Sequence, residues 1–166
     1  MNIKKQTTRL KRTKVDTVSK RDHIYTGFGF KVKLMNAPMV EINGELMLDI
    51  DYNKLADALF ESISEKSTRL TGAEVKFIRH HAGLTLEKFS KRFDVSHPAV
   101  IKWEKQGDKS TNMTWAIEKD IRLFILEISK AKASQYKTLY QNLKKVPAES
   151  KAPRLTRIDV QEYLAV

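Results

Sequence analysis

The side chains that most often perform catalysis or bind metals occur here without the spacing that such work requires. The sequence has no cysteine, which excludes thiolate metal sites, disulfides and cysteine nucleophiles. His80 and His81 are adjacent, so they point ~100° apart around a helix and do not chelate one ion together. Asp49 and Asp51 lie on the exposed side of an expected strand, where carboxylates are solvated rather than catalytic. The segment 27–29 (Gly-Phe-Gly) lacks the third glycine of a dinucleotide-binding turn. We therefore predict no enzymatic activity, no metal and no cofactor.

The chain does carry a strong positive charge, and the charge is unevenly distributed. Among 166 residues, 31 Lys and Arg face 20 Asp and Glu, a net charge of +11 that suits a polyanion such as nucleic acid. Residues 1–25 carry +6 with few large apolar side chains, which predicts a disordered basic arm. Residues 26–68 carry −3, whereas 69–110 and 111–145 carry +4 each. The acidic segment is therefore expected to be a separate unit that does not touch DNA.

Two further properties limit where the protein works. No apolar run approaches the ~18 residues of a membrane span, so no membrane association is expected. The absence of cysteine fits a reducing compartment, and we expect a cytoplasmic protein.

Alternation of apolar and polar residues predicts a small antiparallel sheet in the acidic segment. The expected strands are residues 28–34, 39–42 and 45–51. Asn43-Gly44 between the last two is the strongest short hairpin signal, because a type I′ turn needs positive φ at both positions. A turn is expected at residues 36–38 (Asn-Ala-Pro), and apolar residues from Leu55 to Ile63 at spacing four predict a helix. The unit, residues 26–68, is too small to be stable alone, so we expect it to pack on a neighbour, dimerise or bind a partner.

Helix-capping residues occur three times between residues 71 and 98. Thr71 with Glu74 forms a capping-box pattern, and Gly83 suits the left-handed stop of that helix. Thr85 and Ser96 are caps for two further short helices, the last with a proline in its first turn. Three short helices with brief turns suit a helix laid in a DNA groove better than a catalytic cleft.

Residues 70–106, "LTGAEVKFIRHHAGLTLEKFSKRFDVSHPAVIKWEKQ", resemble the helix-turn-helix of Xre/Cro-type transcriptional regulators. That pattern has an Arg, a Gly-Leu-Ser/Thr step, a short helix, a Val-Ser turn and a helix that ends in Trp-Glu. This chain has Asp94 where the family usually has a turn glycine, and Asp tolerates the left-handed conformation. Leu86 replaces a Gln that often contacts a phosphate.

The resemblance implies a role for each of twelve residues. The helix at 97–105 becomes the recognition helix in the major groove. Base contacts are expected from His97, Pro98, Ile101 and Lys102. Phosphate contacts are expected from Thr85, Ser96, Lys105, Lys109 and Asn112. Structural roles are expected for Arg79, Glu104 and Trp103, the first two as a salt bridge.

The remaining residues complete an α+β fold that is mainly α, in which a small sheet unit precedes a repressor-like helical bundle. Residues 69–130 are the expected DNA-binding domain, and 131–166 a C-terminal helix and tail. The helix after residue 131 is longer than the bundle needs, so it covers the sheet or contacts a second subunit. The end of the chain is a strand, a helix or a partner-binding segment.

The order of parts, a β-rich unit before an Xre-type domain, is similar to MqsA-like antitoxins. Those proteins bind zinc through cysteine pairs, and zinc is not implied here because the chain has no cysteine.

We therefore expect a sequence-specific double-stranded DNA-binding transcriptional regulator. It is expected to act as a repressor, as a homodimer on a palindromic operator, with autoregulation as the antitoxin of a toxin–antitoxin module as its setting. The alternative is a protein-interaction module or antitoxin that mainly masks a partner protein, such as a cognate toxin.

Overall fold

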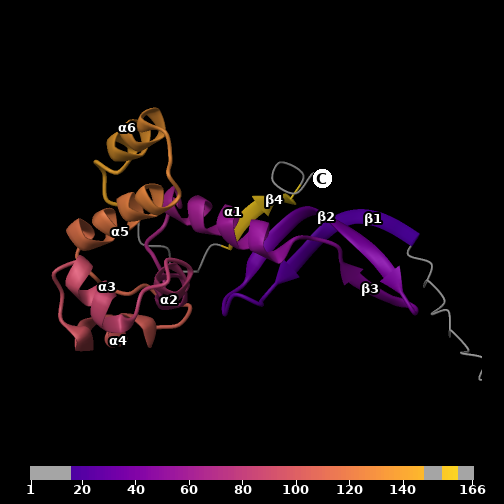
Figure 1. Cartoon of the computed structure of the whole chain (residues 1–166), viewed down its shortest axis with the longest axis horizontal. Coiled ribbons are helices and arrows are strands. Elements are labelled where there is room, and N and C mark those ends of the chain that lie inside the picture. Colours follow the sequence, from indigo (N-terminus) through magenta and orange to yellow (C-terminus); the bar gives the residue numbers. More distant parts are fainter. Residues whose placement is uncertain (1–15, 148–154, 161–166) are drawn as a thin grey trace, which may run out of the picture.

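The computed structural model describes residues 16–147 and 155–160, which form a small sheet at one end and a helical bundle at the other (Figure 1). The predicted α+β class, with more residues in helices than in strands, is confirmed. The strands are β1 (Asp16–Tyr25), β2 (Val32–Ile42), β3 (Glu45–Leu48) and β4 (Thr156–Asp159). The helices are α1 (Tyr52–Ser64), α2 (Gly72–His81), α3 (Leu86–Arg92), α4 (His97–Glu104), α5 (Trp115–Ile128) and α6 (Ala133–Asn142).

Strand β2 is the centre of the sheet and carries partners on both edges. β1 pairs with it in antiparallel register from Asp16↔Glu41 to Tyr25↔Val32. The opposite edge is shared, because β3 pairs antiparallel with residues 39–42 and β4 pairs parallel with residues 32–35. The expected sheet was purely antiparallel, and the parallel strand β4 makes it mixed. Asn43 and Gly44 have φ of 55° and 84°, as the type I′ prediction requires.

The predicted turn at residues 36–38 is wrong, because β2 runs through it without interruption. Asn36 has a φ of 55° and lies where the register with β1 shifts between Arg21 and His23. An asparagine that adopts the left-handed conformation therefore marks a β-bulge inside a strand rather than the end of one. The hairpin turn lies earlier instead, so Phe28 and Phe30 precede the strand that they were expected to form.

The prediction of a disordered arm over residues 1–25 is wrong for residues 16–25, which form β1. Residues 19–22 of this strand are exposed and polar, so apolar burial does not hold that part in place, although Tyr25 at the end of β1 packs against the core. Backbone hydrogen bonds to β2 hold these residues in a strand, and amino-acid composition alone does not reveal such pairing. The rest of the predicted arm, residues 1–15, lies outside the described residues.

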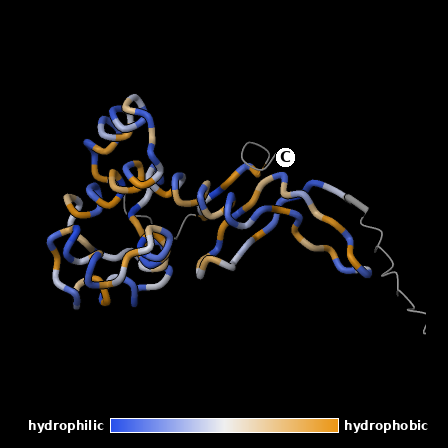
Figure 2. Tube along the Cα trace, viewed as in Figure 1, coloured by the Kyte–Doolittle hydropathy of each residue, from blue (hydrophilic) through white to orange (hydrophobic). Residues whose placement is uncertain are grey.

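Helix α1 joins the sheet to the bundle. Its buried side chains Leu55, Leu59 and Ile63 belong to one hydrophobic core that also contains Val32 and Leu34 of β2. The same core continues into residues of α2–α5 and takes in Ile158 of β4. Figure 2 shows hydrophilic and hydrophobic residues alternating along the strands, as a sheet covered on one face requires. The charge distribution had suggested that the sheet unit is separate, but the sheet shares one core with the bundle.

The structure also tests predictions for Asp51, for the helix after residue 131 and for the C-terminal segment. Asp51 was expected in a strand, but it caps α1, where its carboxylate accepts from the backbone N–H groups of Asn53 and Lys54 at 2.9 and 3.2 Å. Helix α6 packs on α5 through Leu139 and Leu143, so it does not cover the sheet. Of the C-terminal segment, residues 156–159 form strand β4, as one of the three alternatives predicted, and residues 161–166 lie outside the described residues.

Candidate nucleic-acid interface

Three capped helices, α2, α3 and α4, build the candidate interface as predicted. Thr71 and Glu74 form the capping box of α2, and Thr85 and Ser96 cap α3 and α4 through their hydroxyl oxygens. The turns between them contain Gly83 at φ 68° and Asp94 at φ 50°, so aspartate does adopt the conformation usually given to glycine.

The predicted structural residues hold α4 against α2. Arg79 donates from Nε and Nη2 to the two carboxylate oxygens of Glu104 at 2.6 and 3.0 Å, a two-point ion pair. It also donates from Nη1 to the carbonyl oxygen of Leu84 at 3.1 Å, which ties the α2–α3 turn to the same group. Trp103 is buried in the core, as expected. These contacts fix the orientation of α4 relative to the helices behind it.

The loop after α4 is hydrogen-bonded to the start of α2, a contact that we did not predict from the sequence. The backbone N–H of Gly72 donates to the carbonyl of Lys109 at 3.1 Å, and Ala73 N–H donates to Gly107 at 2.8 Å. A Cβ atom on Gly72 would lie 2.2 Å from the carbonyl oxygen of Trp103, so only glycine fits. A glycine directly after the capping Thr71 was the available signal.

The predicted base-contacting residues lie along α4, from its first residue, His97, to Lys102. His97, Pro98 and Lys102 are exposed, and Ile101 is half-buried. Pro98 and Lys102 are four residues apart and therefore share one helix face. Within the described part of the chain, no hydrogen bond or ion pair engages the side chains of His97 or Lys102. An imidazole and an ammonium group are thus presented to solvent beside an apolar proline ring.

The predicted phosphate-contacting residues surround that face. The hydroxyl oxygens of Thr85 and Ser96 accept from the backbone N–H groups of Lys88 and Ala99 at 3.2 and 3.3 Å. Each hydroxyl therefore keeps its own proton for donation to a phosphate oxygen. The remaining three, Lys105, Lys109 and Asn112, are exposed in and after the loop that follows α4. Two exposed carboxylates, Asp94 and Asp108, lie in the flanking turns and reduce the local positive charge.

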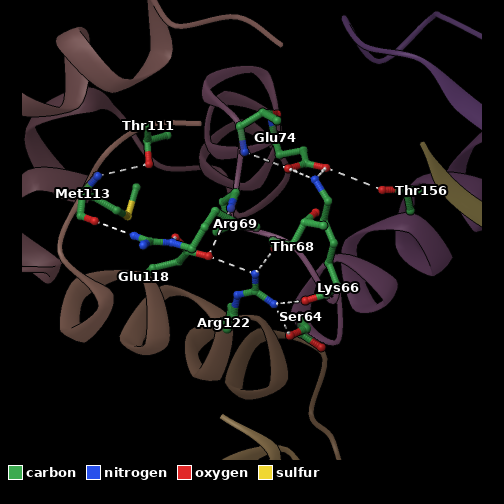
Figure 3. Close-up of polar contacts among 12 residues, drawn as sticks. Ser64, Lys66, Thr68, Arg69, Glu74, Thr111, Met113, Glu118, Arg122 and Thr156 are labelled. Atoms are coloured by element: carbon green, nitrogen blue, oxygen red, sulfur yellow. Dashed lines mark hydrogen bonds and ion pairs between the residues drawn. The ribbon is translucent and has the colours of Figure 1, made fainter. Parts of the chain in front are cut away.

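A buried ionic network behind the interface was not predicted (Figure 3). Arg122 on α5 is 0% exposed and donates to the carbonyl oxygens of Ser64, the last residue of α1, and of Lys66 and Thr68 in the α1–α2 linker, residues 65–71. Its Nη2 also donates to Glu118 at 2.9 Å, and Glu118 accepts from Arg69 Nε at 2.6 Å and from the Leu70 N–H at 3.0 Å. The sequence shows Glu118 and Arg122 at spacing four, but such a pair is equally typical of a solvent-exposed helix face.

A second buried ion pair connects the linker to α2. Lys66 Nζ donates to both carboxylate oxygens of Glu74 at 2.7 and 2.8 Å, and the two side chains are 8% and 3% exposed. Glu74 is also the capping-box residue that accepts from the Thr71 N–H. The start of α2 is therefore held from the side of the sheet as well as from the loop after α4.

The two adjacent histidines face different neighbours, as predicted. His80 Nε2 lies 3.0 Å from Arg79 Nη2, whereas His81 Nε2 lies 3.1 Å from Asp57 of α1 and its ring lies against Phe60. Close to this pair, burial and the neighbouring Asp57 raise the pKa of the Glu61 carboxyl above its ordinary value. Among the described residues no group of three or more histidines and acids is placed to hold a metal ion, and no helix is long and apolar enough to cross a membrane.

Comparison with protein-family models, with curated protein sequences and with solved structures finds no match to this chain.

Proposed function

We propose that this chain is a sequence-specific double-stranded DNA-binding transcriptional regulator that reads the major groove with α4. The observation that carries the proposal is the exposure of His97 and Lys102 on α4, both unpaired within the described residues, on a helix that the Arg79–Glu104 ion pair holds in place. Lysine donates to guanine O6 and N7, and an apolar group such as Pro98 packs on a thymine methyl.

The chemistry around α4 supports contact with the DNA backbone. Thr85 and Ser96 keep free hydroxyl protons at the first turns of α3 and α4, where the partial positive charge of the helix N-terminus also attracts phosphate. Lys105 and Lys109 follow on a loop that Gly72 holds close. Backbone contacts of this kind fix register, while the α4 side chains supply discrimination.

A regulator of this type works best as a homodimer on a palindromic operator. Two recognition helices about 34 Å apart occupy successive major grooves, and their discrimination multiplies. We further propose that the protein is a cytoplasmic repressor, and that it controls its own operon as the antitoxin of a toxin–antitoxin module.

Fluorescence anisotropy with duplexes from the upstream region, at two salt concentrations and against random DNA, tests the proposal. We expect a preference for the upstream duplex and a steep fall of affinity with salt. Lys102→Ala should cost about 1–3 kcal/mol on the cognate duplex, because a base contact is lost. Lys137→Ala is the matched control, since Lys137 is exposed on α6 at the opposite end of the bundle from α4 (Figure 1). Equal binding of cognate and random DNA would refute the sequence-specific function.

The second candidate is a protein-interaction module, and one observation favours it. Met47 of β3 and Ile24 of β1 are 50% and 45% exposed on the sheet that projects away from the bundle, while Leu46, which points to the opposite face of β3 from Met47, is 42% exposed. A partner with an apolar surface, such as a cognate toxin, would cover Met47. Size-exclusion chromatography with the product of the neighbouring gene tests this. We expect Met47→Lys to abolish co-elution, whereas His97→Ala with Lys102→Ala should leave it intact.

A further inference from the structure

A cleft of about 530 Å³ opens between the α1–α2 linker and strand β4, on a part of the molecule separate from α4. Its size falls within the range of small-molecule sites, and it lies where the sheet meets the linker to the bundle. Three cationic side chains line it, Lys33, Lys66 and Arg157, together with four hydroxyl-bearing residues. None of its lining residues is acidic. A cleft that gathers cations and hydroxyl donors without a carboxylate is suited to an anion.

The three cations differ in how much of their charge is already neutralised. Lys66 gives two of its three ammonium protons to Glu74, which leaves one proton for a ligand. Lys33 pairs at 2.7 Å with Asp22, which is half exposed and does not line the cleft. The guanidinium of Arg157 is exposed, and within the described ranges it has no hydrogen bond or ion-pair partner. Asp22 also interacts electrostatically with Arg157, but no hydrogen bond among the described residues occupies the guanidinium of Arg157, whose planar fork can donate two hydrogen bonds to one oxyanion.

The hydroxyl groups complete the donor set on the linker side. Ser67 is exposed and Thr68 is buried, and no hydrogen bond among the described residues engages either hydroxyl. On the opposite wall, Thr156 of β4 places its hydroxyl 3.5 Å from Glu74, close to the limit for a hydrogen bond (Figure 3). Donors from the linker and from β4 thus converge on one space.

We propose that this cleft binds a small phosphorylated molecule, with its phosphate group held by Arg157, Lys66 and the hydroxyl of Ser67. A phosphate offers several acceptor oxygens and no donor when fully ionised, so it matches a lining whose charged groups are all cationic and whose hydroxyl groups can donate. Leu155 is the one apolar side chain of the lining, and no aromatic ring is present to stack on a base. The remainder of the ligand is accordingly small and polar rather than a nucleobase.

The position of the cleft makes such a ligand an effector. Lys66 and Thr68 line the cleft with their side chains, and their backbone carbonyls are the ones that Arg122 holds. A phosphate on Lys66 also competes with Glu74, the capping-box residue of α2. Binding therefore acts on the linker and on the first turn of the helix that supports the loop after α4. This proposal is independent of the proposed function, because the cleft does not include any expected DNA contact.

Titration of the full-length chain with inorganic phosphate and with pyrophosphate, at constant ionic strength in chloride, tests the site by amide chemical shifts. We expect saturable shifts at Ser67, Thr156 and Arg157. Arg157→Gln should weaken binding roughly tenfold or more, because a charged hydrogen-bond donor is lost. Lys54→Gln removes an exposed cation of α1 outside the cleft and should bind phosphate like the wild-type chain.

Three outcomes would overturn the proposal: no saturable shift with either probe, shifts confined to residues 96–105, or equal binding by Arg157→Gln and Lys54→Gln. The fold of each variant is checked by its own amide spectrum, and because Arg157 is exposed its replacement should leave that spectrum intact. A parallel DNA titration separates the two proposals. Phosphate binding with loss of all DNA preference would refute only the DNA-reading function, and the converse would refute only the cleft.

Discussion

Replacement of Arg122 by methionine should destabilise the protein far more than the same replacement at Arg92. Arg122 is 0% exposed and donates to the carbonyl oxygens of Ser64 at the end of α1 and of Lys66 and Thr68 in the α1–α2 linker, and to Glu118. Arg92 pairs with Asp120 and Glu127 at 3.4 and 3.3 Å, and its side chain is 39% exposed. The two variants thus remove the same group from a buried and from a solvated environment.

The magnitude follows from what each variant leaves behind. Arg122→Met leaves three carbonyls, one at the end of α1 and two in the linker, without their donor, and an unsatisfied buried polar group costs about 1–3 kcal/mol each. Burial of the methionine side chain returns about 1.5–3 kcal/mol, and Glu118 keeps its bonds to Arg69 and to the Leu70 N–H. A net loss of about 3 kcal/mol is expected, against a total stability of about 5–15 kcal/mol for a typical domain. Arg92→Met should cost less than about 1 kcal/mol.

Urea unfolding followed by tryptophan fluorescence measures both variants. Trp115 is a suitable reporter because the Arg122 guanidinium lies 5.7 Å from its ring centroid. Arg122→Lys adds a check on geometry: it keeps the charge but cannot reach three carbonyls with one ammonium group, so it should lie nearer to the methionine variant than to the wild type. Equal losses for Arg122→Met and Arg92→Met would refute the assignment of Arg122 as the group that holds the linker.

Three further predictions rest on single side chains. Gly72→Ala should cost about 2–3 kcal/mol in urea unfolding, because its Cβ would meet the Trp103 carbonyl at 2.2 Å; a wild-type midpoint would contradict that contact. Glu61→Gln should raise the free energy of unfolding at pH 7 by less than about 1 kcal/mol. Burial and then Asp57 raise the pKa of Glu61, so its ionisation opposes folding, and the gain should vanish as pH falls below that pKa. Ser96→Asp should retain the cap of α4 and its stability but weaken binding to every duplex, because a carboxylate repels phosphate; Ser96→Ala should cost about 1 kcal/mol of stability.

Local chemistry explains which elements the sequence predicted correctly. The cap of each helix from α2 to α4 depends on one short-range hydrogen bond, so Thr71, Thr85 and Ser96 were identifiable from residue type and spacing alone. The same holds for Asn43-Gly44, whose positive φ values are a property of two residues. The Arg79–Glu104 ion pair was predicted through a resemblance of motif, and its side chains meet across 25 residues.

The elements that were missed depend on partners distant in the chain. β1 is polar and exposed over residues 19–22, and only its pairing with β2 makes it a strand. β4 joins β2 in parallel across more than a hundred residues, and a four-residue segment has no period to detect. Asn36 illustrates the ambiguity of one signal, because the same left-handed preference serves a turn or a bulge. Arg122 was hidden because its acceptors are backbone carbonyls, which leave no trace in residue identity.

The linker between α1 and α2 determines how the sheet is positioned relative to the helical bundle. Arg122 holds the linker from α5, Lys66 pairs with Glu74, and Arg69 pairs with Glu118, so these three charged side chains connect the linker to the bundle. Because the sheet, α1 and the bundle also share one hydrophobic core, the sheet cannot reorient without breaking these buried contacts. A partner or a second copy bound at the sheet would therefore set the position of α4 rigidly. Weakening the linker at Arg122 should release that constraint, whereas a change on α4 itself should alter recognition and leave the geometry of assembly unchanged.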